Sequence, residues 1–153
     1  MSYWLFKSEP DCFSIDDLRA RRNSIEHWDG VRNYQARNML RDDVKKGDEI
    51  LFYHSNCNPP GIAGVATVVK EGYPDHTSWD LHSEHFDPRS SEEKPMWYMV
   101  DVKFKEKFPR LLSLDELKTN SALHDMLILR KGNRLSITPV TAGEWKAILK
   151  MVQ

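Results

Sequence analysis

The chain has 153 residues, of which 40% are hydrophobic and 29% are charged, and its formal net charge is −1. This composition excludes a disordered protein, and the length predicts a single domain, residues 1–153, around one core. No apolar run approaches the roughly 18 residues of a membrane-spanning helix, and two cysteines are too few for a disulfide framework, so we expect a reduced intracellular protein with no membrane partner.

The first third of the chain predicts a strand, two helices and a second strand. Tyr3–Lys7 is a short apolar run typical of a buried strand. Ser14 stands three residues before Asp17, the spacing of a helix-starting capping box. Asn33 is a good N-cap for a second helix, and Glu49–Ser55 has the composition of another strand.

The rest of the chain predicts three more strands and two more helices. Gly61–Tyr73 is apolar but rich in small residues, which indicates sharp bending or close backbone approach. Residues 96–108 alternate between apolar and polar side chains, as in a half-buried strand. Ser113–Glu116 and Thr141–Glu144 are two further capping boxes, and Arg134–Val140 is the last strand candidate.

The order of these elements predicts the fold class. Strands recur at irregular intervals with helices between some of them, so the regular alternation of a parallel α/β fold is absent. No glycine-rich phosphate-binding loop is present either. We therefore expect an α+β protein, a mixed sheet curled into a barrel with flanking helices.

An enzyme or metal site finds little support in the sequence. One acidic segment, 75–87, carries several side chains that bind metals, but it has no HExxH or CxxC spacing, and metal binding there stays open. Its candidate ligands are Asp75, His76, Asp80, His82, Glu84, His85 and Asp87. Cys57 stands near His54, yet the stretch around it reads as a turn with two prolines. We expect no cofactor.

Binding is better supported, beginning with the stretch WDGVRNYQARN. Trp28 and Tyr34 offer flat faces on which a nucleobase would stack, and the helix start after Asn33 offers free N–H groups to an anion. Arg37 and Arg41 share a helix face with Asn33, where they would meet a phosphate backbone. An alternative stays open, in which Trp28 packs in the core and the arginines pair with Asp42 and Asp43.

Two strand ends and the charge distribution also favour a binding function. Lys7 and Ser8 follow one buried strand, and Tyr53, His54 and Ser55 end another, so these polar groups are expected to converge on one rim. Residues 71–101 have a net charge of −6 and residues 102–153 a net charge of +5. A local basic face of this kind steers a polyanion, although surface ion pairs would give the same counts.

The motifs YWLFKSEP, WDGVRNYQARN, GDEILFYHSN, GIAG, YPD, MVDVKF and GNRLSITPVT occur in an order that resembles the EVE-domain family, which includes thymocyte nuclear proteins and compact bacterial relatives. The resemblance covers essentially the whole chain. It implies the PUA-like fold, related to the YTH readers of methylated adenine. It also implies a non-enzymatic reader of a modified base, either a 5-methylcytosine type in DNA or a modified base in RNA.

The resemblance and the stacking argument together define an expected base-binding pocket. Its residues are Lys7, Ser8, Trp28, Arg32, Asn33, Tyr34, Tyr53, His54, Ser55, Arg134, Leu135 and Ser136. Arg37 and Arg41 are expected to contact the nucleic-acid backbone. A separate nuclease or modification-system partner would couple recognition to an outcome, in the cytoplasm of a bacterium or the nucleus of a eukaryote.

A second class of function stays open on the residues alone. His54 with Tyr53 could serve a small enzyme, or a small-ligand-binding protein, of nucleotide or nucleic-acid modification metabolism. Histidine titrates near neutral pH, which suits general acid–base chemistry in a polar pocket. Turnover of modified nucleotides that is lost in His54→Ala would distinguish this function from base reading.

Overall fold

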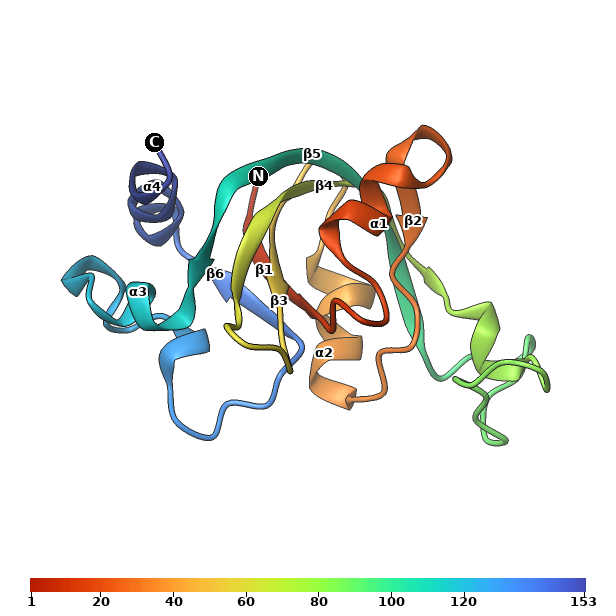
Figure 1. The fold of residues 1–153 in the computed structure, drawn as a ribbon. Coiled ribbons are helices and arrows are strands. Elements are labelled where there is room, and N and C mark those ends of the chain that lie inside the picture. Colours follow the sequence, from red (N-terminus) through yellow and green to blue (C-terminus); the bar gives the residue numbers. More distant parts are fainter.

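A computed structural model describes residues 1–153 and contains one six-stranded mixed sheet (Figure 1). The strand order is β2-β5-β4-β3-β1-β6, and only the β1–β3 pairing is parallel. The strands are β1 (Tyr3–Ser8), β2 (Ile25–His27), β3 (Glu49–His54), β4 (Gly61–Pro74), β5 (Tyr98–Ser113) and β6 (Ile137–Val140). The α+β class and the curled mixed sheet are confirmed. The sheet is not a closed barrel, because β2 and β6 each pair on one side only and remain its edges.

Four α-helices flank the sheet, and their starts follow the predicted caps. They are α1 (Ile15–Ala20), α2 (Tyr34–Asn38), α3 (Leu114–Lys118) and α4 (Ala142–Met151). The helix α2 continues into a π-helical turn, η2 (Met39–Asp43), and short 3₁₀ turns occupy η1 (Arg22–Ser24), η3 (His76–Trp79), η4 (Ser121–Leu123) and η5 (Leu127–Leu129). No helix of the structure is long and apolar enough to cross a membrane.

The capping boxes differ in how completely they form. Ser14 and Thr141 both show the reciprocal pair of hydrogen bonds, so two of the predicted boxes are confirmed. Ser113 caps α3 by accepting from the Glu116 N–H, but the Glu116 carboxylate is bound by Arg110 at 2.7 Å. Only half of that box forms, because a charge-assisted partner is available to Glu116.

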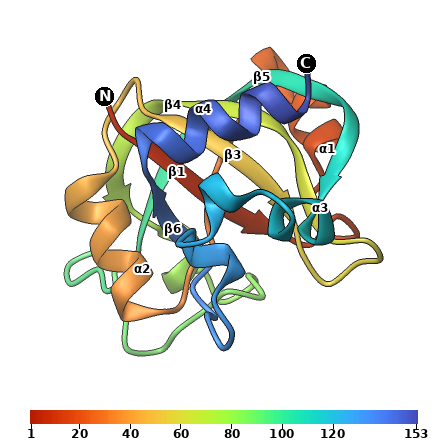
Figure 2. The same cartoon turned by 90° about the vertical axis from the view of Figure 1, so that its left-hand side faces the viewer.

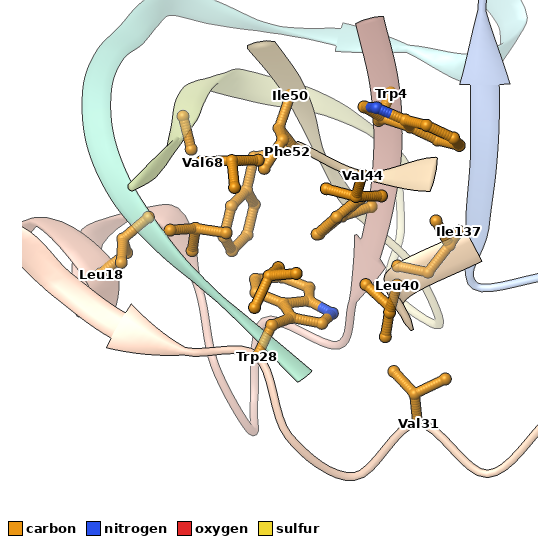
Figure 3. Close-up of a cluster of buried hydrophobic side chains, with 14 of the residues drawn as sticks. Trp4, Leu18, Trp28, Val31, Leu40, Val44, Ile50, Phe52, Val68 and Ile137 are labelled. Atoms are coloured by element: carbon orange, nitrogen blue, oxygen red, sulfur yellow. The ribbon is translucent and has the colours of Figure 1, made fainter. Parts of the chain in front are cut away.

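Both faces of the sheet are covered, so its central strands alternate between two apolar clusters. Trp4 and Phe6 of β1 point to one face and Leu5 to the other. On the first face the cluster lies inside the curl and includes buried side chains of α1 and α2 (Figures 1 and 3). On the second face, α4 lies across β1 and β3, with α3 nearby (Figure 2).

Small residues in β4 allow the sheet to curl, as their composition predicts. The β4–β5 register shifts repeatedly, starting between Ile62 and Gly64. A Cβ atom at Gly61 or Gly64 would overlap the backbone of β5, at Leu112 and Glu106 respectively. These glycines therefore permit close contact between the two long strands where the sheet bends.

Two details of the strand prediction are wrong. The edge strand β2 was not expected, because Ile25–His27 is too short to show an alternating pattern. The last strand begins at Ile137 rather than Arg134, so Arg134, Leu135 and Ser136 lie in the loop before it. That loop is exposed at Arg134 and pairs with β1 only at its end, where Lys7 N–H donates to the Ser136 carbonyl at 2.9 Å.

Candidate functional site

A cavity of about 590 Å³ opens between the end of β1, the edge strand β2 and the loop after η3. This volume lies within the range of small-molecule and cofactor sites. Its lining residues are Lys7, Ser8, Glu9, Cys12, Phe13, Arg21, Glu26, His27, Trp28, Asp29, Gly30, Ser83, Glu84 and His85. Of the residues expected to bind a base, the structure therefore brings Lys7, Ser8 and Trp28 together.

Trp28 forms the apolar floor of the cavity. The residue is 8% exposed, and its ring packs against Phe6 and Phe52, with ring centroids 5.3 and 5.4 Å away. Figure 3 shows Trp28 beside Phe52 in the buried cluster. Its indole N–H has no acceptor in the chain, whereas those of Trp4 and Trp97 donate to Asp48 and Asp87. No buried side-chain polar atom lacks a partner, so the Trp28 N–H must reach solvent. Trp28 is a core residue with one polar edge open.

Lys7 lines the cavity at the end of β1. It pairs with Tyr53 of β3 in parallel register, and paired strand residues share a face, so its side chain lies on the face of Tyr53, away from Trp28. Partial burial lowers the pKa of Lys7 from its ordinary value. The other lining residue with a permanent positive charge, Arg21, is bound to Glu26 at 2.8 Å.

The walls of the cavity are rich in carboxylates. Glu9, Glu26, Asp29 and Glu84 all line it, against the two cations. Because like charges repel, this balance disfavours a phosphate inside the cavity. It favours a neutral ligand that presents N–H donors to the walls.

The segment Ser83–His85 closes one side of the cavity, and Arg32 holds it in place although it lies far away in sequence. Arg32 donates to the His85 carbonyl from Nε at 3.2 Å and from Nη2 at 2.6 Å. The His85 ring lies over Gly30, where any Cβ atom would be only 2.7 Å from it. Gly30 also has a φ of +78°, which favours glycine. The turn after Trp28 thus fixes the wall.

Asp75 stabilises the same turn by accepting hydrogen bonds from both Gly30 and Arg32. It is fully buried and accepts from the Gly30 N–H at 2.9 Å and from Arg32 Nη1 at 3.0 Å. Burial opposes its ionisation, but hydrogen bonds from Thr77, Gly30 and Arg32 outweigh that effect and hold the pKa of Asp75 below its usual range. Arg32 is therefore engaged within the protein rather than free to meet a ligand.

Several expected pocket residues have other roles in the structure. The Asn33 side chain caps α2 by accepting from the Ala36 N–H at 3.0 Å, which occupies part of the expected anion seat. Tyr53 is buried in the cluster on the other face of the sheet. The His54 Nε2 atom accepts from the Ile15 N–H at 3.1 Å, and burial lowers the pKa of His54.

The remaining expected residues lie near β1 or on the surface. Ser55 N–H donates to the Ser8 carbonyl at 2.9 Å, beside the cavity but not lining it. Arg37 donates to the Met96 carbonyl at 2.8 Å, and Arg41 pairs with its neighbour Asp42 at 2.8 Å. Tyr34 is exposed on α2 and also stays outside the cavity.

The acidic segment 75–87 does not form a metal centre in the structure. No group of three or more His, Cys, Asp or Glu side chains is arranged to hold a metal ion. Asp75 faces Gly30 and Arg32, while Asp87 accepts from Trp97 and Arg89. The segment contributes His85, Glu84 and Ser83 to the cavity instead.

The structure is an α+β domain with an open cavity at the end of β1, and comparison with known proteins identifies its family. The EVE domain model matches residues 2–151, so the chain belongs to the EVE-domain family. Human thymocyte nuclear protein 1 is 45% identical over 166 aligned positions, which cover 98% of this chain and 73% of the human protein. A fission-yeast protein without an assigned function is 38% identical, over 95% of this chain and 66% of its own length.

Solved structures agree with the fold. A Pseudomonas syringae protein with 49% identity superposes with a TM-score of 0.94, covering 99% of this chain and all of that one. Human THYN1 in complex with DNA containing 5-methylcytosine is 44% identical, with a TM-score of 0.93 over 100% of this chain and 98% of that one. A Zymomonas mobilis ASCH protein with 11% identity and a TM-score of 0.58 shares the fold alone.

Proposed function

We propose that this protein binds DNA and recognises a modified base of the 5-methylcytosine type in the cavity above Trp28, without catalysing a reaction. The observation that carries the proposal is the cavity itself, with Trp28 in its lining, an indole N–H that has no acceptor in the chain, and carboxylates on its walls. The human THYN1 complex with 5-methylcytosine DNA, which aligns over the whole chain, supports the choice of ligand.

The groups of the cavity complement the edge of a cytosine. A cytosine ring presents oxygen and nitrogen acceptors beside an exocyclic amine donor. The Trp28 N–H is a donor for one of the acceptors, and Asp29 is an acceptor for the amine. The edge of Phe13 offers apolar contact to a 5-methyl group. Such contact contributes roughly 1–3 kcal/mol of discrimination.

The base would enter as a flipped-out nucleotide while its phosphates stay outside. Extrusion costs a few kcal/mol, and it costs least when the base is unpaired. The carboxylates of the cavity repel phosphate, so the backbone must find its cations elsewhere. Arg130, Lys131 and Arg134 are exposed in the loop before β6, and none of them forms an ion pair. These three side chains are suited to contact the backbone, with affinity that falls as salt rises.

The first test is binding of short fluorescent oligonucleotides at low salt. The panel contains cytosine, 5-methylcytosine, 5-hydroxymethylcytosine, adenine and N6-methyladenine in single- and double-stranded DNA and RNA. We expect a preference of about fivefold or more for a modified cytosine in DNA, roughly 1 kcal/mol. A preference confined to RNA would transfer the proposal to that polymer, and uniform binding of every member would overturn base recognition.

A pair of aspartate variants separates cavity contacts from general charge effects. Asp29→Ala removes the acceptor proposed for the amine, whereas Asp43→Ala removes an exposed carboxylate outside the cavity. We expect Asp29→Ala to weaken binding of the preferred oligonucleotide about tenfold and to reduce the preference. Asp43→Ala should change affinity little and preserve the preference. Equal changes in the two variants would contradict a role of the cavity.

The structure gives no support to the alternative enzyme that uses His54 and Tyr53. His54 is bonded to the start of α1, and Tyr53 lies on the opposite face of the sheet. Burial also raises the pKa of Tyr53 to about 12, so its phenol stays protonated. Because the proposed domain only recognises DNA, cleavage or modification would require a separate nuclease or modification-system partner.

A further inference from the structure

Tyr34 presents an unusual exposed aromatic surface outside the cavity. Its side chain is 48% exposed, although large aromatic side chains are mostly covered. The ring stacks on Trp97, with centroids 5.1 Å apart and planes 20° from parallel. Trp97 is itself buried, and its indole N–H donates to Asp87 at 2.8 Å. The buried Trp97 ring therefore holds the Tyr34 ring in place, so Tyr34 loses little conformational entropy when it contacts a ligand.

One face of the Tyr34 ring is stacked on Trp97, and two guanidinium groups lie close to the ring. The Arg37 guanidinium lies 5.1 Å from the Tyr34 centroid and 6.0 Å from the Trp97 centroid. A group on the outer face of Tyr34 would lie much farther from Trp97 than from Tyr34, because the two rings are stacked. The Arg37 guanidinium is therefore not centred above the outer face of Tyr34. The Nη1 atom of Arg89 donates to the Tyr34 hydroxyl at 3.4 Å.

The stack is connected to the cavity wall through one side chain. The Arg32 guanidinium lies 5.4 Å from the Trp97 centroid and also donates to the His85 carbonyl. Tyr34 is therefore next to the cavity without lining it.

Arg89 is paired with Asp87 at 3.0 Å, and Arg37 donates to the Met96 carbonyl at 2.8 Å. Each guanidinium nevertheless has five N–H groups and keeps some for a ligand. An aromatic face beside two such groups complements a flat nucleobase and its phosphate.

We propose that the outer face of Tyr34, with Arg37 and Arg89, is a second site that stacks the base adjacent to the one held in the cavity and contacts its phosphate. The identity of the occupant as DNA rests on the function proposed above. Tyr34 belongs to the recognition surface, as its sequence context indicates, but it acts on a different nucleotide from Trp28. The domain then engages two consecutive nucleotides.

The test pairs a protein variant with a ligand variant. Single-stranded DNA with one 5-methylcytosine is compared with versions that carry an abasic site on the 5′ or the 3′ side of it. Wild type, Tyr34→Phe and Tyr34→Ala are titrated with each ligand. Tyr34→Phe keeps the ring and removes only the hydroxyl contact to Arg89, so it is the matched control. Thermal unfolding and near-ultraviolet circular dichroism establish that each variant keeps the Trp97 environment.

We expect Tyr34→Ala to weaken binding of the intact strand roughly five- to hundredfold, and Tyr34→Phe to change it little. An abasic site on one side should weaken binding by wild type to a similar degree, and the Tyr34→Ala loss should disappear with that ligand. Additive losses, or none from Tyr34→Ala, would overturn the second site. If wild type stacks the neighbour but ignores the methyl group, the second site stands and base recognition in the cavity fails.

Discussion

Arg32 donates two hydrogen bonds to the backbone carbonyl of His85, at 3.2 Å from Nε and 2.6 Å from Nη2. The two residues are 53 positions apart in sequence. This contact fixes one wall of the cavity, because the carbonyl belongs to the segment that faces Trp28 across the open space. The same guanidinium satisfies buried Asp75, so cavity shape and local stability depend on one side chain.

Replacing Arg32 by lysine should therefore loosen the wall and destabilise the protein. Lysine keeps the charge near Asp75 but cannot form the paired hydrogen bonds to the carbonyl. We expect a loss of about 1.5–3 kcal/mol of unfolding free energy in urea, with faster hydrogen exchange in the 83–86 backbone. Arg41→Lys is the control, because the side-chain hydrogen bonds of Arg41 go only to its exposed neighbour Asp42. Equal stability of the two variants would contradict the role of Arg32.

Gly30→Ala should cost more than its backbone conformation alone explains. An alanine in the left-handed region costs about 1–2 kcal/mol, and here its Cβ would also overlap the His85 ring. Gly132→Ala is the matched control, since its φ is +81° and no atom lies within 4 Å of the added Cβ. The excess cost at Gly30 should vanish in a His85→Ala background. If it persists there, the ring contact is not its cause.

The fold was largely predictable because each element carries its own local signal. The continuous apolar runs of β1 and β3 indicate strands that are buried on both faces, and the boxes at Ser14 and Thr141 start their helices as expected. Closure of the barrel was not predictable in this way. It depends on whether the two edge strands meet, and no local pattern encodes that pairing.

The cavity was only partly predictable because half of its lining is brought in by tertiary contacts. Lys7 and Ser8 follow a recognisable strand, and Trp28 precedes a recognisable turn. Ser83–His85 instead reads as a polar loop, and its position depends on the pairing of Arg32 with a distant carbonyl. The polar end of β3 also predicted that Tyr53 lines the cavity, but the alternation of β3 turns that side chain to the opposite face of the sheet.

At Trp28, the effect of a substitution on stability must be separated from its effect on DNA binding. The sequence left open whether Trp28 stacks a base or packs in the core. The ring packs against Phe6 and Phe52, so Trp28→Ala should cost about 3–5 kcal/mol. Trp28→Phe keeps most of that packing and removes the open N–H. We expect about two- to tenfold weaker binding of 5-methylcytosine DNA by Trp28→Phe. Trp145→Phe, in the cluster on the other face, should bind as wild type does. Equal binding by both variants would show that the Trp28 N–H does not contact the base.

His54 should make folding stability depend on pH below neutrality. Burial lowers the pKa of His54 from its ordinary value of 6.5, with Lys107 in the same sense and Asp16 and Asp17 opposed. The unfolded chain therefore binds the proton more readily than the folded one. The contribution of neutral His54 is complete above pH 6.5 and is lost as pH falls through the lowered folded value.

His54→Gln provides the matching measurement, because an amide oxygen can still accept from the Ile15 N–H but does not titrate. The free energy of unfolding is measured for both proteins between pH 8 and pH 5, at roughly half-unit steps about the histidine pKa. Wild type should lose stability relative to His54→Gln as the pH falls below 6.5. An NMR titration should place the His54 imidazole pKa under 6.5. A constant difference between the two proteins across this range would show that His54 is not buried as a neutral acceptor at the start of α1.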